Sequence, residues 1–509
     1  MKPYILHSLF LWGLLFGQSD LPATVIPNGL FADHMVLQRE KPIQVWGNAC
    51  PGEKVSVVLN GDKVIAVADS NGFWKCELPA RSASTLPISL SITSDRMAVP
   101  VVFNDILIGD VWLCAGQSNM TLYLKYLTNS PGVSDDISKA DYPMIRLGSV
   151  ARQPSITPVG SRSVSWSVCS PETVGMFSAP GFYFARAVQK ELGVPIGVIL
   201  SSFGSTCTEE WISKEALDSD PLSRKRLEQQ QERNRNALAA DQESKTWIGA
   251  IKGKIRFWLF KEAPPNPSKI LNKTATAHYN GMIHPLAPFP IKGVIWYQGE
   301  EEALEKRAED HGRQLALLIN DWRRLWGNPK LPFMIQQLPE FKGEGAEMTE
   351  WSELREAQAQ VVKKTPGAYL VCGFGAGEPE GLHPANKREI GRRWGLAVLN
   401  EIYGRKIPAF GPVFESMTVE GGEIRVHFKN AKGLATTDGM PPKGFYIRGE
   451  DHSFVPAKAR LDGASVVLSS EQVPRPIAVR YAFRNVPADL NLTNDSGLPA
   501  FPFRAEEGR

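Results

Sequence analysis

The feature that most constrains this chain is a series of short, continuous apolar segments in its middle part, each followed by polar residues. Such a run is typical of a strand buried on both faces of a parallel sheet. Between these runs, apolar residues recur at helical spacings. Strands that alternate with amphipathic helices favour an α/β fold with a doubly wound parallel sheet. The predicted strands are 111–115, 194–202, 292–300, 331–339 and 368–373, and the predicted helices include 182–193, 315–326 and 354–362.

The first of these strands leads directly into Ser118, in the segment GDVWLCAGQSNM (109–120). Ligands of an open parallel sheet gather at the carboxyl ends of its strands, so a serine there is well placed to act as a nucleophile. Gly116 permits the tight turn that this position needs. The alternative is that Ser118 is the N-cap of the next helix, and the motif taken alone favours that interpretation.

On both sides of this α/β region, the sequence predicts short strands that are not separated by helices. Residues 54–67 alternate in polarity around Asn60-Gly61, which predicts a β-hairpin, and short β-rich segments return after residue 408. A chain of 509 residues is expected to form two or three domains. We expect a β-sandwich at 24–104, a catalytic α/β domain at 105–404 with a helical insertion near 213–275, and a β-rich domain at 405–509.

The amino terminus predicts a secretory signal peptide at 1–23. Lys2 precedes an apolar run over 4–16 that is short for a membrane span, and small residues follow it, so we expect cleavage near Ser19 or Ala23. An uncleaved anchor or a buried helix is the alternative. The expected location is secreted or periplasmic, with no membrane span after cleavage.

Composition excludes several classes of protein. The 57 Lys and Arg residues nearly balance the 54 Asp and Glu residues, so the net charge of +3 gives no reason to expect nucleic-acid binding. Six scattered cysteines without a C-x-x-C pair predict neither a zinc site nor a dense disulfide framework. Export permits disulfides, and pairing of Cys50 with Cys76 stays open.

Three motifs together resemble one known family. GDVWLCAGQSNM, the segment YNGMIHPLAPFPIKGVIWYQGE (279–300) and the segment GLHPANKREIGRRW (381–394) are similar to the SGNH-type carbohydrate esterases, specifically the sialate O-acetylesterase family. The resemblance implies that Ser118 is the acyl-accepting serine and that His383 is the base. His284, which precedes Pro285, is a nearby alternative, but His383 comes last in chain order, as in SGNH enzymes.

The resemblance also implies an oxyanion hole formed by Gly204 and Gln298. Gly204 lies in SSFGST (201–206), where the family usually has Trp-Gly-Gly, and taken alone it is an ordinary turn glycine. Gln298 has a second interpretation as a buried amide that binds loop backbone. The same motifs supply Gln117, Asn119 and Glu300 as predicted substrate contacts.

The residue that orients His383 departs from the family pattern. The family commonly has an Asp two residues before the histidine, where this chain has Gly381. SGNH enzymes more broadly have an Asp three residues before it, so Glu380 is the predicted third member of the triad. Glu378 is close by, and a backbone carbonyl is an equal alternative to either carboxylate.

The predicted function is a serine esterase that removes O-acetyl groups from sugars, with sialic acids as the first expectation. Acetylxylan or another acetylated polysaccharide is the alternative substrate, because such motifs specify acyl chemistry and not the glycan pocket. A non-catalytic glycan-binding protein is the rival of another class. No cofactor or metal is expected, and the only expected partner is an O-acetylated glycan.

Overall fold

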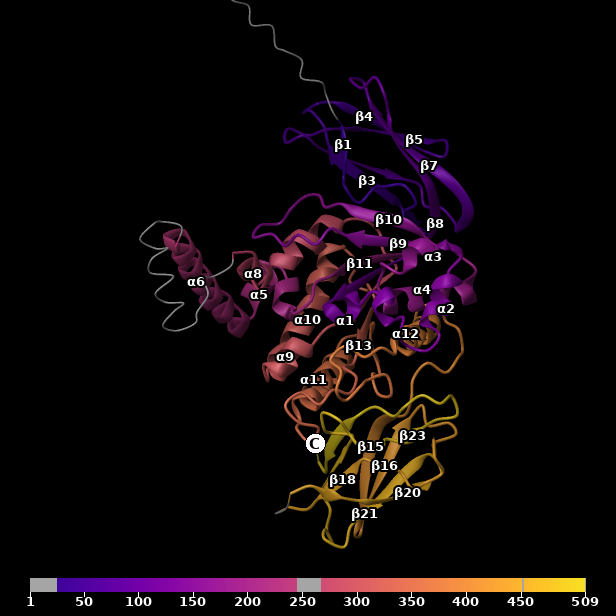
Figure 1. The fold of residues 1–509 in the computed structure, drawn as a ribbon, viewed down its shortest axis with the longest axis vertical. Helices are drawn as coiled ribbons and strands as arrows, with labels where there is room; N and C mark the ends of the chain where they lie inside the picture. The colour runs from indigo at the N-terminus through magenta and orange to yellow at the C-terminus, as the bar shows by residue number, and fades with distance from the viewer. Residues whose placement is uncertain (1–24, 245–266, 451–452, 509) are drawn as a thin grey trace, which may run out of the picture.

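The computed structural model describes residues 25–244, 267–450 and 453–508. The predicted signal peptide at 1–23 lies outside these residues. Figure 1 shows β-strands of the N-terminal part at one end, a central layer of helices and strands, and a C-terminal group of strands at the other end. No helix among the described residues is long and apolar enough to cross a bilayer.

The N-terminal part consists of short strands, as predicted. The predicted hairpin is confirmed as β4 (Lys54–Leu59) and β5 (Asp62–Val67). Asn60 and Gly61 have φ angles of +46° and +97°, as a tight two-residue hairpin turn requires. β7 (Ser84–Ser94) pairs with β4, and a separate three-stranded sheet contains β1 (Ile26–Pro27), β3 (Ile43–Asn48) and β6 (Phe73–Leu78).

One long strand, β8 (Val101–Gly116), connects this part to the central layer. Its first half pairs with β7 and with β2 (Val36–Gln38), and its second half lies at the centre of the large sheet. The predicted boundary between residues 104 and 105 therefore falls inside a strand, and no linker separates the two parts.

The central layer is a mixed sheet in which every neighbouring pair except β9 with β10 is parallel. Along the sheet the strands follow the order β10-β9-β11-β8-β12-β13-β14. Their bounds are β9 (Tyr142–Val150), β10 (Val164–Cys169), β11 (Ile196–Ser202), β12 (Gly293–Tyr297), β13 (Phe333–Gln336) and β14 (Ala368–Val371). The strands predicted in this region are thus confirmed.

Both faces of this sheet are buried. Along β8, Trp112 and Cys114 pack in the core that contains α4 (Ala179–Leu192) and α12 (Lys387–Glu401), which lie against each other. Leu113 and Ala115 face the other core, with α10 (Ala308–Leu325). α11 (Glu350–Lys364) packs beside α10. The continuous apolar run of β8 is explained by this two-sided burial.

The region where an insertion is predicted is helical among the described residues. It contains α5 (Lys214–Ser219), α6 (Pro221–Ser244) and α8 (Pro267–Asn272), which lie to the left of the central layer in Figure 1. Residues 245–266 of the predicted insertion lie outside the described residues. Short helical turns connect the other elements: α1 (Ser118–Thr121), η1 (Leu124–Leu127), α2 (Val133–Ser138), α3 (Pro171–Val174), η2 (Thr208–Trp211), η3 (Tyr279–Ile283), η4 (His284–Leu286) and α9 (Glu300–Leu304).

The C-terminal part has strands where they are predicted. One sheet contains β15 (Val413–Glu420), β16 (Glu423–Lys429), β21 (Ser465–Ser469) and β20 (Lys458–Asp462), and a second contains β19 (Val455–Pro456), β18 (Phe445–Arg448), β22 (Ala478–Tyr481) and β24 (Phe503–Glu506). β17 (Ala435–Thr436) pairs with β23 (Leu492–Thr493). Cys372 and Phe374, just beyond β14, pack in the core of this part. All six cysteines are unpaired, including Cys50 and Cys76.

Candidate active site

Ser118 lies on a tight turn at the carboxyl end of β8. Gly116 has a φ of +138°, and a Cβ at this position would stand 2.0 Å from the carbonyl oxygen of Tyr297 on β12. Only glycine fits such a close approach. Gln117 is the N-cap of the one-turn helix α1, so the alternative interpretation of Ser118 as the N-cap is wrong.

The structure brings Ser118 and His383 together although 265 residues separate them. The Ser118 Oγ lies 2.7 Å from the His383 Nε2, within hydrogen-bond distance. His383 is on the exposed loop between β14 and α12, and Ser118 is half-buried. His284, the alternative histidine, instead has its Nδ1 3.0 Å from the carbonyl oxygen of Val159.

Gly204 lies directly beside the serine. A Cβ on Gly204 would be 3.5 Å from the Cβ of Ser118. Within the described residues, neither the Ser118 N–H nor the Gly204 N–H donates to a protein acceptor. Two free backbone donors next to a serine hydroxyl are what a tetrahedral oxyanion requires.

Gln298 is fully buried at the end of β12, and its side chain binds loop backbone. Its Nε2 donates to the carbonyl oxygen of Thr206, two residues beyond Gly204. This contact corresponds to the alternative interpretation of Gln298, because the amide stabilises the loop that contains Gly204 and does not face an open site.

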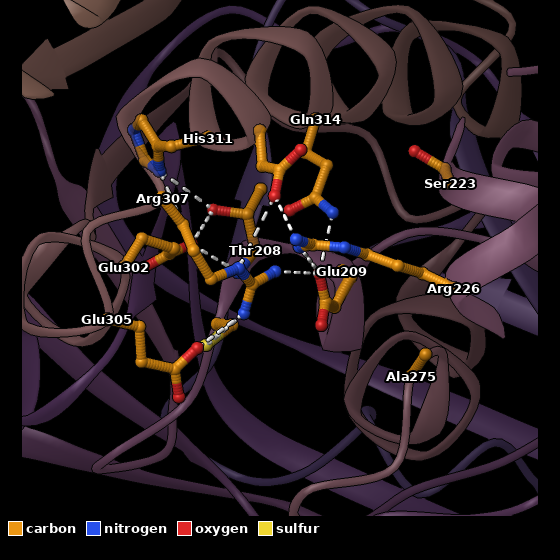
Figure 2. Close-up of polar contacts among 12 residues, drawn as sticks. Thr208, Glu209, Ser223, Arg226, Ala275, Glu302, Glu305, Arg307, His311 and Gln314 are labelled. Carbon is orange, nitrogen blue, oxygen red and sulfur yellow. Dashed lines mark hydrogen bonds and ion pairs between the residues drawn. The ribbon is translucent and has the colours of Figure 1, made fainter. Parts of the chain in front are cut away.

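Further along the chain, a cluster of buried polar and charged side chains surrounds Thr208 (Figure 2). The backbone N–H and the hydroxyl of Thr208 each donate to Glu302 at 2.6 Å, and the His311 Nδ1 lies 3.3 Å from the same carboxylate. Burial alone would raise the pKa of Glu302, but the hydrogen bonds from His311 and Thr208 outweigh it and lower that pKa to about 2. Glu302 thus stays ionised and fixes the loop. An acidic residue shortly after a predicted strand is the one signal in the sequence that could have pointed to this role.

The three predicted substrate contacts lie beneath the site. Gln117, Asn119 and Glu300 are each at most 2% exposed. Glu300 accepts a hydrogen bond from the Gln117 side chain and another from the Asn119 Nδ2 at 2.5 Å. Because their polar groups bind one another inside the protein, the structure does not present them to a substrate.

The predicted triad member Glu380 does not contact His383. Its side chain is 77% exposed and forms an ion pair with Lys342. Glu378 points into the loop, where it accepts a 2.8 Å hydrogen bond from the backbone N–H of Ala385. No partner for the His383 Nδ1 occurs among the described residues. In the described part of the chain, neither Glu378 nor Glu380 binds His383, and Gly381 has no side chain that could do so.

The electrostatic surroundings keep His383 able to accept a proton. The partial burial of its imidazole, followed by the positive charge of Lys387, lowers the pKa of His383 below its ordinary value of 6.5. The imidazole is then neutral at pH 7. A neutral imidazole in contact with a serine hydroxyl is the arrangement of a general base and a nucleophile. Among the described residues, no group of three or more His, Cys, Asp or Glu side chains is placed to hold a metal ion.

Comparisons with known proteins point to one family. Residues 260–399 match the family model described as carbohydrate esterase, sialic acid-specific acetylesterase. A sialate O-acetylesterase of Mus musculus is 28% identical over 523 residues, with 93% of each chain covered, and that of Homo sapiens is 25% identical over 416 residues, with 75% of this chain and 72% of the human protein covered.

A solved structure extends the similarity to the whole fold. The crystal structure of a carbohydrate acetylesterase from Xanthomonas citri superimposes with a TM-score of 0.81 at 32% identity, covering 95% of this chain and 100% of that one. Sequence and fold therefore agree over nearly the full length, and the chain belongs to the sialate O-acetylesterase family of carbohydrate esterases.

Proposed function

We propose that this protein is a serine esterase that removes O-acetyl groups from sugars, with O-acetylated sialic acid as the substrate. The observation that supports it most directly is the 2.7 Å contact between the Ser118 Oγ and the His383 Nε2, beside the free N–H groups of Ser118 and Gly204. The relatives named above as sialate O-acetylesterases support the choice of sugar.

The reaction follows from the geometry. The His383 Nε2 takes the hydroxyl proton while the Ser118 Oγ attacks the acetyl carbonyl carbon, and the oxyanion receives hydrogen bonds from the N–H groups of Ser118 and Gly204. His383 then returns the proton to the departing sugar oxygen, which leaves an acetyl group on Ser118. Water, deprotonated by His383, attacks this acyl-enzyme, and acetate and the free serine are formed.

We infer roles for the remaining predicted residues that differ from direct catalysis. Gln298 positions the loop of Gly204 through the carbonyl of Thr206. Gln117, Asn119 and Glu300 support the turn of Ser118 from below. Glu380 has no part in the reaction, and His383 works with Ser118 as a dyad.

We also propose the finer architecture and location. The parallel strands with a buried core on each face support an SGNH-like doubly wound sheet. The division at 24–104, 105–404 and 405–509 remains our proposal for the three parts, with β8 shared by the first two. The apolar run at 4–16 supports export to the periplasm or the medium.

The test compares Ser118→Ala with Ser134→Ala, an exposed serine on α2, as the matched control. Ser118→Ala should lose about four orders of magnitude or more in hydrolysis of p-nitrophenyl acetate, whereas Ser134→Ala keeps the full rate. A panel of O-acetylated sialic acid, acetylxylan and acetylated neutral sugars then identifies the substrate. Wild-type protein that cleaves none of these esters would favour a glycan-binding protein.

A further inference from the structure

A chain of buried polar side chains lies beneath the Ser118–His383 pair and connects three segments of the fold. Asn119, next to Ser118, binds Glu300 on α9 through its Nδ2. On its other side, the Lys387 Nζ at the start of α12 donates to the Asn119 Oδ1 at 2.5 Å. The side chain of Lys387 is fully buried, and its ammonium lies 5.1 Å from the centre of the Tyr297 ring.

Burial of the Lys387 ammonium destabilises the fold. Burying an ammonium group carries a large desolvation penalty before its partners are counted, and a positive charge in the first turn of a helix opposes the helix dipole. Burial lowers the pKa of Lys387 to about 7, against the opposing influence of Glu300 and Glu378. An apolar side chain would avoid both costs, so stability does not explain why a lysine stands here.

The contacts of Asn119 suggest what the lysine does. Besides binding Glu300, the Asn119 Nδ2 donates to the backbone carbonyl of Leu382 at 3.0 Å. Asn119 follows Ser118 and Leu382 precedes His383, so a single amide group bridges the neighbours of the two reacting side chains. The ammonium requires an oxygen and the carboxylate requires an N–H, so Lys387 and Glu300 together specify which way the amide faces.

His383 needs such a bridge more than a histidine with a carboxylate partner does. Gly381 supplies no side chain, Glu380 points to Lys342, and the His383 Nδ1 has no partner among the described residues. The place of the imidazole therefore depends on the backbone of its loop. The bond from Asn119 to Leu382 is the contact that ties this backbone to the turn of the serine.

We propose that Lys387 is a positioning residue, which fixes the Asn119 amide so that the His383 loop stays in register with Ser118. The proposal rests on the proposed function, because it assigns Lys387 to the Ser118–His383 reaction. Lys387 does not touch the reacting atoms, so it acts on turnover and not on the binding of substrate.

The test is Lys387→Met, with Arg392→Met on the same helix as the matched control, since Arg392 is exposed and forms an ion pair with Glu389. With p-nitrophenyl acetate, we expect Lys387→Met to lower kcat at least about tenfold with KM within about twofold, and Arg392→Met to change neither. An unchanged kcat in folded Lys387→Met overturns the proposal. A rise in KM alone also overturns it, because that result indicates substrate binding.

The pH profile separates positioning from a general loss of structure. The charged or titratable groups that face Lys387 are Glu300 on α9, Glu378 in the His383 loop, Tyr297 on β12 and His383 itself. Removal of the positive charge stabilises the imidazolium, so the acid limb of the rate profile should move to higher pH in Lys387→Met. A limb that does not move contradicts the placement of Lys387 beside His383.

Two further measurements keep the result decisive. If Lys387→Met does not fold, Lys387→Gln, which keeps a donor for Asn119 without the charge, should fold and keep kcat within about threefold of wild type, and a loss of about tenfold or more in that folded variant overturns the proposal. Labelling of Ser118 by a fluorophosphonate reports its activation without a sugar substrate. Wild-type protein that is labelled but cleaves no acetyl ester refutes the proposed substrate, whereas equal labelling rates of wild type and Lys387→Met refute the role of Lys387.

Discussion

Replacing Gly204 by alanine tests where the acyl oxygen binds. The added Cβ would lie 3.5 Å from the Ser118 Cβ and 4.0 Å from its Cα, which is ordinary van der Waals contact. The φ of Gly204 lies outside the left-handed region, so alanine fits the backbone without strain. The free energy of unfolding should therefore change by less than about 1 kcal/mol, in either direction.

The same methyl group would occupy the space beside the nucleophile where the oxyanion forms. Loss of one oxyanion donor costs roughly a hundredfold to a thousandfold in turnover, and Gly204→Ala keeps its N–H but displaces the oxygen. We expect a fall of about tenfold to a hundredfold in kcat/KM for p-nitrophenyl acetate, measured beside a thermal melt. Gly160→Ala is the control, because a Cβ at Gly160 meets nothing within 4 Å. Full activity in Gly204→Ala would refute the oxyanion site.

Three further predictions concern the base and its surroundings. Partial burial and the charge of Lys387 lower the pKa of His383, and only the neutral imidazole accepts a proton. The value of kcat/KM should therefore be level near pH 7 and reach half its maximum below pH 6.5. A midpoint above pH 6.5 contradicts the assignment of His383 as the base. Glu380→Gln should keep a hydrolysis rate within about twofold of wild type. Glu378→Gln weakens the acceptor of the Ala385 N–H, so its rate should fall further. The reverse order would restore Glu380 as the orienting residue. Incubation with a metal chelator should leave the rate unchanged, and inactivation that zinc reverses would replace the serine mechanism by a metal-activated water.

The sequence predicted five of the seven strands of the central sheet, because these five have unbroken apolar runs, whereas β9 and β10 at one edge contain polar residues within their runs and were not predicted. Along β8, both faces are covered, and the resulting unbroken apolar run is easy to recognise. The helix α4 ends at Gly193 in the left-handed conformation, as the glycine suggested. The boundary after residue 104 was harder to predict. The pairing of β8 with β2 and β7 is a long-range contact, and no local pattern in the sequence indicates it.

At the site, the direction in which each side chain points was what the sequence could not predict. Gln117 is extended and Ser118 begins the helix α1, so the side chain of Ser118 points to another side than those of its two neighbours. Ser118 consequently faces His383 while its neighbours face Glu300 in the interior. A motif identifies which residues lie near the chemistry, but it does not tell which of them point toward the substrate.

The His383 loop shows how a missing side chain changes the way a base is held. A Cβ on Gly381 would stand 3.0 Å from a carboxylate oxygen of Glu378, so Glu378 fills the space that a side chain at 381 would enter. Glu378 uses its other oxygen to bind the N–H of Ala385, beyond the histidine. Asn119 binds the carbonyl of Leu382, before the histidine. The loop is thus attached to polar side chains on both sides of His383, and the orientation of the imidazole follows from two backbone attachments instead of from an acceptor on its Nδ1.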